Sequence, residues 1–397
     1  MDTANSQVSA DSNRSNAELM ATQKRQSVGD MLRAHSAALG IGLVFMALSL
    51  FYSLVIPAWE ADNEISHFNY VQYLIEHRSL PTLQSRVDMP VMVDACRSGE
   101  ENLQQRLNAQ FRQPPLYYLL GAAATFWTDA DTTGPNAGNP FVLWDPSQLG
   151  YNVALHHRDA EAPPYTGTLL ALHSLRFFSG LLALGGLVAT YLLGLLVFSG
   201  QRPLALAMMA VNAFIPQYIF ASAIVNNDIA VAAFSSWCVL LCAFTALRAP
   251  RVRFLLAAAL FAGLAISAKY NAAVLLPLVA ATALTVFIHS WRAGGRRFRS
   301  TVLKVVAVAI VAGLASLLWF VVDPDLQFRW QFLSGRLAQY IKYLAVGFGR
   351  RTLPGLGDAT RYAFTTFWGQ FGWDTLTLPS WATFILAVVS GLASVGV

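Results

Sequence analysis

The sequence predicts an all-α membrane protein, a polytopic bundle of about eight transmembrane helices joined by a long outer loop. Hydrophobic residues make up 55% of the 397 positions and charged residues only 12%, which is too apolar for a soluble chain of this length. Arg residues gather in the connections between the apolar runs. The net charge of +5 therefore reflects membrane topology. No nucleic-acid partner is expected, because no basic patch is interleaved with aromatic residues.

Residues 1–36 form a polar arm, and Ala37 to Pro57 is the first predicted span. The arm is rich in Ser, Asn, Ala and Gln with mixed charges, a composition typical of disordered segments. It is too long and too polar to begin a cleaved signal peptide. The apolar run that follows is long enough for one crossing and is typical of a signal anchor. We expect the arm and the N-terminus on the cytoplasmic side.

Residues 58–168 are predicted to be a long extracytoplasmic loop that carries interfacial helices. Turn residues interrupt the loop throughout its length. One apolar piece inside it runs from Pro114 to Trp127, which is too short to cross about 30 Å of hydrocarbon. We expect this piece to be an interfacial or re-entrant helix with proline at its first turn.

Residues 169–322 are predicted to be a six-span bundle, followed by a second outer segment and a last span. The six runs are Leu175–Phe198, Leu204–Ile224, Ile229–Leu247, Phe254–Ala268, Ala272–Ile288 and Val302–Val322. Arg residues mark every second connection, which the positive-inside rule assigns to the cytoplasm. Residues 323–380 then form a second extracytoplasmic segment that lies on the membrane. The final run 381–397 has no cytoplasmic tail, so we expect it to be a truncated span.

The acidic motif after the first span is the strongest candidate for chemistry. Its members are Glu60, Asp62, Glu64 and His67. If a helix begins near Asp62, whose side chain could cap it, Glu64 and His67 share one face. An apolar stripe of Phe68, Val71, Leu74 and Ile75 would cover the other face. Burial raises the pKa of a carboxylate, so such a group can act as a general base. The alternative is an interfacial cap or a solvated loop.

The remaining charges also favour chemistry at one membrane face. Four of the predicted spans contain no Asp, Glu, Lys or Arg, which argues against an ion-coupled transporter. The sequence has no phosphate-binding Gly-rich loop. Nucleotide-activated substrates are made on the other side of the membrane, so an outer-face transferase would need a donor that carries its own activation. A sugar on a polyprenyl phosphate is such a donor. Lys269 and Arg176 could hold its leaving phosphate, the alternative being that each is an interfacial side chain.

Cofactor and metal candidates are weaker. Two Asp-x-Asp triplets, Asp129 to Asp131 and Asp323 to Asp325, could hold a divalent cation, but such triplets are common in loops. His156 and His157, with acidic neighbours, are better explained as solvated loop residues. The three cysteines form no disulfide framework. No metal ligand is therefore assigned.

Several motifs resemble a known family. Pro57-x-Trp59-Glu60-Ala61 followed by Glu64-x-x-His67-Phe68 resembles the P-P-x-E-A-P-D-E-P-x-H-F signature of the domain-of-unknown-function 2142 family of bacterial polytopic membrane proteins. The resemblance covers most of the chain after Ala37. It continues through Pro114-Pro115-Leu116-Tyr117-Tyr118, Leu175-Arg176-Phe177-Phe178-Ser179, Asn212-x-x-x-Pro216-Gln217, Asn226-Asn227-Asp228, Lys269-Tyr270 and Phe367-Trp368-Gly369-x-Phe371-Gly372-Trp373. That family in turn looks like the C-type (GT-C) membrane glycosyltransferases.

The resemblance implies a many-helix fold with a catalytic acid in the first outer loop and a polyprenyl-phosphate sugar donor. Glu64 matches the Glu of the family's Asp-Glu pair, whereas Asn63 stands where the Asp would be and Asp62 could replace it. Further site-lining residues are expected in the shared motifs. These are Tyr117, Asn227, Asp228 and Tyr270.

The sequence therefore favours an inverting sugar transferase on the outer face of a bacterial inner membrane. Asp62 or Glu64 would take the proton from the hydroxyl of a glycan, lipid or protein acceptor, and His67 would orient that carboxylate. The alternative is a non-catalytic membrane subunit or glycan-lipid-binding scaffold of an envelope polysaccharide pathway. Asn63, in the place of the family's Asp, makes this alternative plausible.

Overall fold

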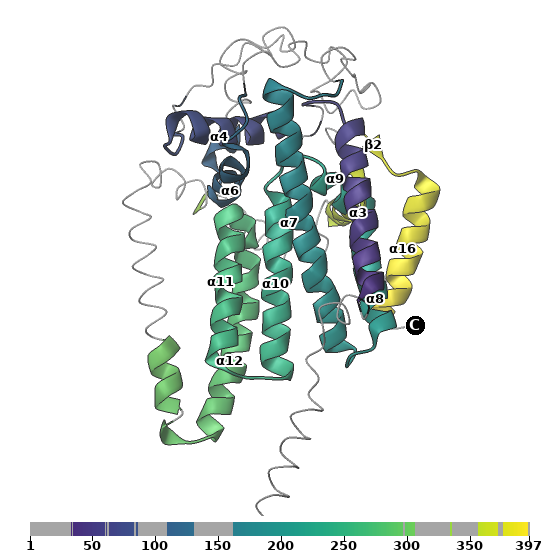
Figure 1. Cartoon of the computed structure of the whole chain (residues 1–397). Helices are drawn as coiled ribbons and strands as arrows, with labels where there is room; N and C mark the ends of the chain where they lie inside the picture. Colours follow the sequence, from purple (N-terminus) through teal and green to yellow (C-terminus); the bar gives the residue numbers. More distant parts are fainter. Residues whose placement is uncertain are drawn as a thin grey trace, which may run out of the picture.

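In the computed structural model, the chain forms a bundle of α-helices with one very short hairpin (Figure 1). The structure describes residues 33, 35–59, 61, 63–82, 85, 109–130, 162–296, 298–305, 334–335, 356–371 and 376–395. Its first elements are α3 (Ser36–Val55), α4 (Glu64–His77), the 3-10 helix η2 (Ala109–Arg112), α6 (Leu116–Thr125) and α7 (Gly167–Val197). Next come α8 (Arg202–Ala213), α9 (Pro216–Ser222), α10 (Asp228–Leu247), α11 (Val252–Ala268), η4 (Tyr270–Leu275) and α12 (Leu276–Arg292). The last are α15 (Leu356–Trp368), the antiparallel strands β1 (Gln370–Phe371) and β2 (Leu376–Thr377), and α16 (Ser380–Val395).

Four helical stretches in the described part are long and apolar enough to cross a membrane. They are α3, α7, α10 and the combined η4 and α12. The bent pair α8 and α9 would be a fifth. The helical class and the presence of several helices suited to crossing a membrane are confirmed at this level, whereas the count of eight spans stays a prediction. Of the other runs predicted to span, α11 and α16 are shorter apolar helices, and most of residues 302–322 lies outside the described residues.

The predicted span from Leu204 to Ile224 forms two helices rather than one continuous helix. The chain forms α8 and α9, which meet at an angle of 65°. Pro216 is the first residue of α9, and Ile215 before it is extended. Because proline has no N–H and disfavours the helical conformation in the residue before it, the helix breaks there.

Helix α7 is the central element of the bundle. It begins at Gly167 rather than at the predicted Leu175 and runs for 31 residues, so it is about 46 Å long. It contacts α3, α6, α8, α9 and α10. Small residues allow the closest of these contacts: a Cβ added at Gly194 would lie 2.7 Å from Cα of Ala205 in α8. The early start of α7 places Arg176 within the helix, whereas the sequence predicted it at a span end.

Helix α4 lies across one end of the bundle, next to α6 (Figure 1). The predicted apolar stripe is confirmed, since Phe68, Val71 and Leu74 are buried in the main core cluster. The helix begins one residue later than an Asp62 cap requires. Asn63 is the N-cap residue, adopts a left-handed conformation with φ of 57°, and makes no side-chain cap hydrogen bond. Asparagine tolerates this conformation better than most residues do.

Helix α6 begins directly after Pro115 and has 10 residues, which is about 15 Å. This length confirms a short apolar helix that does not cross the membrane by itself. It contacts α4, α7 and α11, so it joins the covering layer to the bundle.

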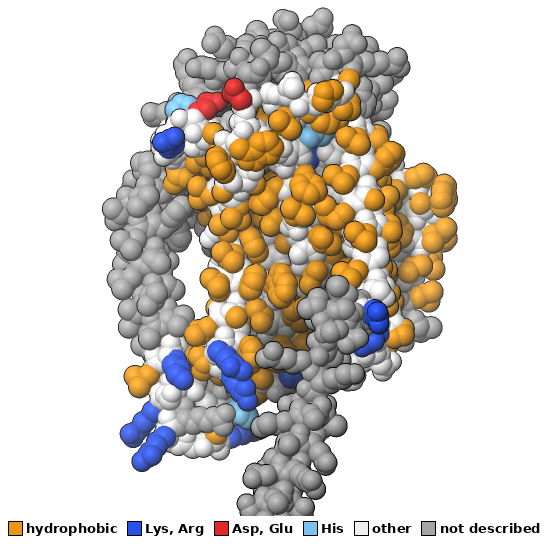
Figure 2. Space-filling model, viewed as in Figure 1, with side chains coloured by type: hydrophobic (Ala, Val, Ile, Leu, Met, Phe, Trp, Pro, Cys, Tyr) orange, Lys and Arg blue, Asp and Glu red, His pale blue; other side chains and the backbone are white. Residues whose placement is uncertain are grey.

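The charges on the surface of the bundle are distributed unevenly between its ends. Figure 2 shows apolar side chains over the sides of the bundle, acidic side chains with a basic one beside them near α4, and most of the visible Lys and Arg at the opposite end. The α7–α8 and α10–α11 connections lie at that opposite end (Figure 1). We call the two ends the α4 end and the basic end. This separation is the pattern that the positive-inside rule describes, although the side of the membrane that each end faces stays a prediction.

Candidate functional site

A buried ion pair between α4 and α7 is the centre of the candidate site. Arg176 donates from Nε to Oε1 of Glu64 over 2.8 Å and from Nη2 to Oε2 over 2.6 Å. Its other N–H groups bind carbonyl oxygens at the end of α3, those of Ser53, Ile56 and Pro57. Both charged side chains are fully buried. A guanidinium has five N–H donors, and these bonds use all of them.

This geometry favours a structural role for both members of the pair. Oε1 of Glu64 also accepts the backbone N–H of Val225 over 3.0 Å, so the carboxylate has three donors. Both oxygens of this buried carboxylate already accept hydrogen bonds from the protein, so a substrate hydroxyl would have to displace one of these donors. Arg176 likewise has no N–H left for a phosphate. The arrangement therefore disfavours Glu64 as the base and Arg176 as the donor-phosphate ligand.

The turn from Val225 to Asp228 connects four helices at the α4 end. Besides the Val225 amide, the N–H of Asn226 donates to the Tyr117 hydroxyl over 3.1 Å. The Asn226 side chain accepts the N–H of Asp228, which opens α10. The Asn227 amide donates to the carbonyl of Ala268 at the end of α11 over 2.8 Å. This turn therefore links α4, α6, α10 and α11.

Lys269 and Asp228 form the second ion pair of the site. Nζ of Lys269 lies 2.7 Å from Oδ1 and 2.8 Å from Oδ2 of Asp228. Their side chains are 26% and 47% exposed, in contrast to the buried Glu64–Arg176 pair. An ammonium has three donors, and Asp228 accepts two hydrogen bonds. Lys269 therefore keeps a donor for an additional anionic group.

His67 lies inside the same region and is held neutral. Its Nδ1 is 2.9 Å from the hydroxyl of Tyr118, and the two rings stack. Burial, and secondarily the positive charge of Lys269, lowers the pKa of His67 from 6.5 to about 3. A neutral imidazole with so low a pKa is a hydrogen-bonding group and a poor base near neutral pH.

Tyr117 ties α6 to α7 at the edge of the site. Its hydroxyl is 2.8 Å from Oγ of Ser179. Burial raises the pKa of Tyr117 well above its ordinary value, so the phenol stays protonated. Tyr270 follows Lys269 as the first residue of η4 and is partly buried.

The structure brings most of the predicted site residues together at the α4 end. Glu64, Arg176, Tyr117 and Asp228 belong to one hydrogen-bonded network through the turn that begins at Val225. Glu60 and Asp62 lie outside the described residues, although Ala61 between them is buried against α9.

The metal candidates gain nothing from the structure. Within the residues that it describes, no group of three or more His, Cys, Asp or Glu side chains could hold a metal ion. The remaining members of the sequence candidates lie outside the described residues. They are Asp131, His156, His157, Asp323 and Asp325.

Sequence reasoning missed several groups of the network. Tyr118 and Ser179 belong to motifs that the resemblance included, yet neither was selected as a site residue. The Val225 amide and the Ala268 carbonyl are backbone groups, which no residue pattern identifies. The only sequence signal for such positions is the end of a predicted helix beside a polar turn.

Comparison of the chain with known protein families, with curated proteins and with solved structures found no match. The fold and the site therefore define only a class, a helical protein with several helices suited to crossing a membrane. Function is argued below from the site itself.

Proposed function

We propose that this chain is a membrane glycosyltransferase that moves a sugar from a polyprenyl-phosphate donor to an acceptor hydroxyl. The observation that carries the proposal is the polar network at the α4 end, which gathers groups from α4, α6, α7, α10 and α11 above an otherwise apolar bundle. A lipid-linked donor would present its phosphate at this level while its chain stays in the bilayer. The full protein would have eight spans, with the α4 end outside a bacterial inner membrane.

The geometry of the charged groups decides which of them is assigned as the general base and which as the phosphate ligand. Because Glu64 is held by three donors, the general base is assigned to Asp62. Asp62 would take the proton of the acceptor hydroxyl as its oxygen attacks the anomeric carbon. The bond from that carbon to the phosphate oxygen breaks, and polyprenyl phosphate leaves. Lys269, the more exposed cation, would bind the leaving phosphate.

The experiment compares Asp62→Asn with Glu64→Gln in the purified full chain. We expect Asp62→Asn to abolish sugar transfer from a polyprenyl-phosphate donor while its melting temperature stays that of the wild type. Glu64→Gln should lower the melting temperature, because breaking a buried ion pair costs about 3–5 kcal/mol. Transfer and release of polyprenyl phosphate are followed by thin-layer chromatography.

The exposed residue Glu76 supplies the matched control, because Glu76→Gln removes a carboxylate from α4 outside the network. That variant should transfer at the wild-type rate. Full transfer by Asp62→Asn would remove Asp62 as the base. Absence of transfer by the wild-type chain with every polyprenyl-phosphate sugar tested would remove the enzymatic proposal.

A second candidate function is a non-catalytic scaffold that binds a glycan lipid. The charges of the site neutralise one another, because Glu64 pairs with Arg176 and Asp228 pairs with Lys269. This pairing favours the scaffold function. A chain that binds polyprenyl phosphate and never releases it from a sugar donor would support the scaffold over the enzyme.

A further inference from the structure

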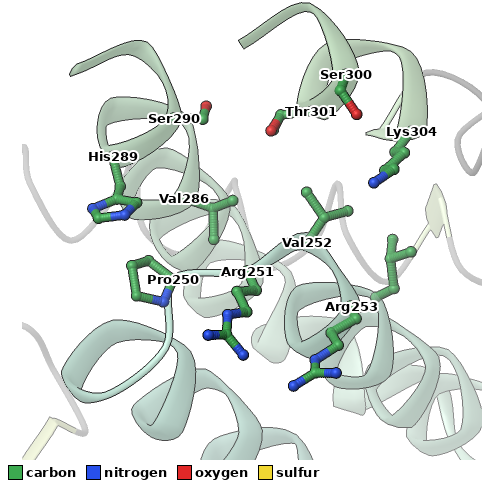
Figure 3. Close-up of a pocket in the computed structure, with 11 residues that line it drawn as sticks. Pro250, Arg251, Val252, Arg253, Val286, His289, Ser290, Ser300, Thr301 and Lys304 are labelled. Atoms are coloured by element: carbon green, nitrogen blue, oxygen red, sulfur yellow. The ribbon is translucent and has the colours of Figure 1, made fainter. Parts of the chain in front are cut away.

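A second polar site lies at the basic end, far along the bundle from the α4 end. A cavity of about 450 Å³ opens between the start of α11, the end of α12 and the helical residues 298–305. Figure 3 shows the side chains around it. No role in the proposed transfer reaction is assigned to any residue of this cavity.

The lining of the cavity combines cations with hydroxyl groups. Arg251, Arg253 and Lys304 supply the charges, while Ser290 and Thr301 supply hydroxyls. The three cations are exposed at the mouth, and both hydroxyl-bearing residues are buried. Guanidinium, ammonium and hydroxyl groups are the usual ligands of phosphate oxygens.

The start of α11 adds to the positive potential of this cavity. Arg251 is the N-cap residue of α11, and no side chain caps the helix there. The N-terminal N–H groups of a helix and its dipole favour an anion at this position. The cations and the helix end thus have the same sign and lie on the same cavity.

The cations have no countercharge within reach of the described chain. From Ile229 to Val322 the sequence contains no Asp or Glu. The ion pairs found among the described residues involve none of the three pocket cations. Uncompensated charges that gather around a cavity are most stable with an anion between them.

The surroundings of the cavity match those of a lipid rather than of a soluble ion. Its wall includes the apolar side chains of Val252, Leu256 and the buried Val286. Leu260 lies one turn beyond Leu256 on α11 and is exposed. A phosphate in the cavity would therefore have room for its acyl chains along α11.

We propose that this cavity binds the phosphate of an anionic membrane phospholipid. The chemistry recognised is a phosphate with a net negative charge, and a free phosphate ion would share it. The two sources differ in the apolar contacts along α11, which only the lipid makes. The site is independent of the proposed sugar transfer.

The test measures phospholipid binding to the purified full chain by native mass spectrometry. Phosphatidylglycerol and phosphatidylcholine of the same chain length are added separately. We expect wild type to prefer phosphatidylglycerol, and the double variant Arg251→Gln with Arg253→Gln to bind it about tenfold more weakly. The same pair changed to lysine should keep at least part of the binding, because the charge remains.

Arg202→Gln is the matched control, because Arg202 is an exposed arginine at the start of α8 and does not line the cavity. It should bind phosphatidylglycerol like the wild type. Equal affinity of the wild type for both lipids, or an equal loss in the Arg202→Gln variant, would overturn the proposal. Binding of inorganic phosphate without any preference for the anionic lipid would overturn the assignment to a lipid.

Discussion

At the residue scale, the Glu64–Arg176 pair shows how an acidic motif can serve the fold. A charged pair in the interior is costly to desolvate, and it is tolerated only when its hydrogen bonds are all made. Arg176 meets this condition with five bonds that join α4, α7 and the end of α3. Through Arg176 the pair also connects Glu64 to the carbonyl of Pro57, so one side chain binds both residues that flank the acidic motif.

The sequence predicted which residues meet here, but could not predict how they pair. Glu64 and Arg176 are separated by 112 positions, and both lie in motifs selected from the sequence. A pattern of residues does not show whether a carboxylate faces a substrate or an arginine. That choice depends on the length of α7 before Arg176 and on the left-handed turn at Asn63.

His67 gives a testable pH dependence. Its pKa is about 3 in the folded protein and 6.5 as the ordinary value, so between these values the unfolded chain binds a proton that the folded chain does not. The stability that depends on a neutral His67 is therefore complete well above pH 6.5 and is lost as the pH falls towards 3. The loss is at most about 1.4 kcal/mol per pH unit and amounts to about 2 kcal/mol between pH 6.5 and pH 4.5, because the unfolded chain is already half protonated at pH 6.5.

We expect His67→Gln to be less sensitive to acid than the wild type in melting experiments between pH 7 and pH 4.5. Glutamine cannot take up a proton, and it can still reach the Tyr118 hydroxyl. His77→Gln changes an exposed histidine of the same helix and should leave the acid sensitivity unchanged. Parallel pH profiles of the wild type and His67→Gln would show that His67 is not the group responsible.

At the element scale, the sequence located the apolar helices well and their ends poorly. The predicted start of the first span lies one residue from the observed start of α3 at Ser36. Hydropathy located α7 but not its first residues, although Thr168, Leu169 and Leu172 in that first part of the helix are buried within the protein. Pro216 indicates a break in the helix, but the residue type alone does not predict the angle of 65° between α8 and α9.

Helix α7 also supplies a matched test of close packing. A Cβ at Gly194 would lie 2.7 Å from Cα of Ala205, whereas a Cβ at Gly185 would meet nothing within 4 Å. Gly194→Ala should destabilise the protein by about 1–3 kcal/mol, because α7 and α8 must separate. Gly185→Ala should be neutral or stabilising by up to about 1 kcal/mol, because alanine favours the helix.

Thermal unfolding of both variants in the same detergent measures the difference. The two positions lie on one helix, so effects of helix propensity alone would act equally on them. If Gly194→Ala melted at the same temperature as Gly185→Ala, the close approach of α7 and α8 would be wrong.

At the scale of the whole molecule, the separation of charges is the feature that the composition predicted best. Arg residues in alternate connections implied that these connections share one end, and the bundle places the α7–α8 and α10–α11 connections there (Figure 1). For the polar network at the other end, the sequence predicted the location but not the hydrogen bonds. Its bonds depend on backbone groups in the turn at Val225, which carry no sequence signature.

The orientation of the bundle can be tested with single cysteines at its two ends. The native Cys96, Cys238 and Cys242 are replaced by alanine, and a cysteine is introduced by Ser79→Cys beyond α4 or by Ser300→Cys at the basic end. Both serine positions are exposed. If the basic end is cytoplasmic, as the positive-inside rule requires, a membrane-impermeant maleimide should label Ser79→Cys in intact bacterial spheroplasts. Ser300→Cys should be labelled only after detergent is added, which also verifies that its thiol reacts.

The reverse pattern would invert the topology and place the polar network of Glu64 and Lys269 in the cytoplasm, where soluble activated donors could reach it. Labelling of both positions from one side would instead mean that the chain crosses the bilayer an even number of times, or not at all, between them.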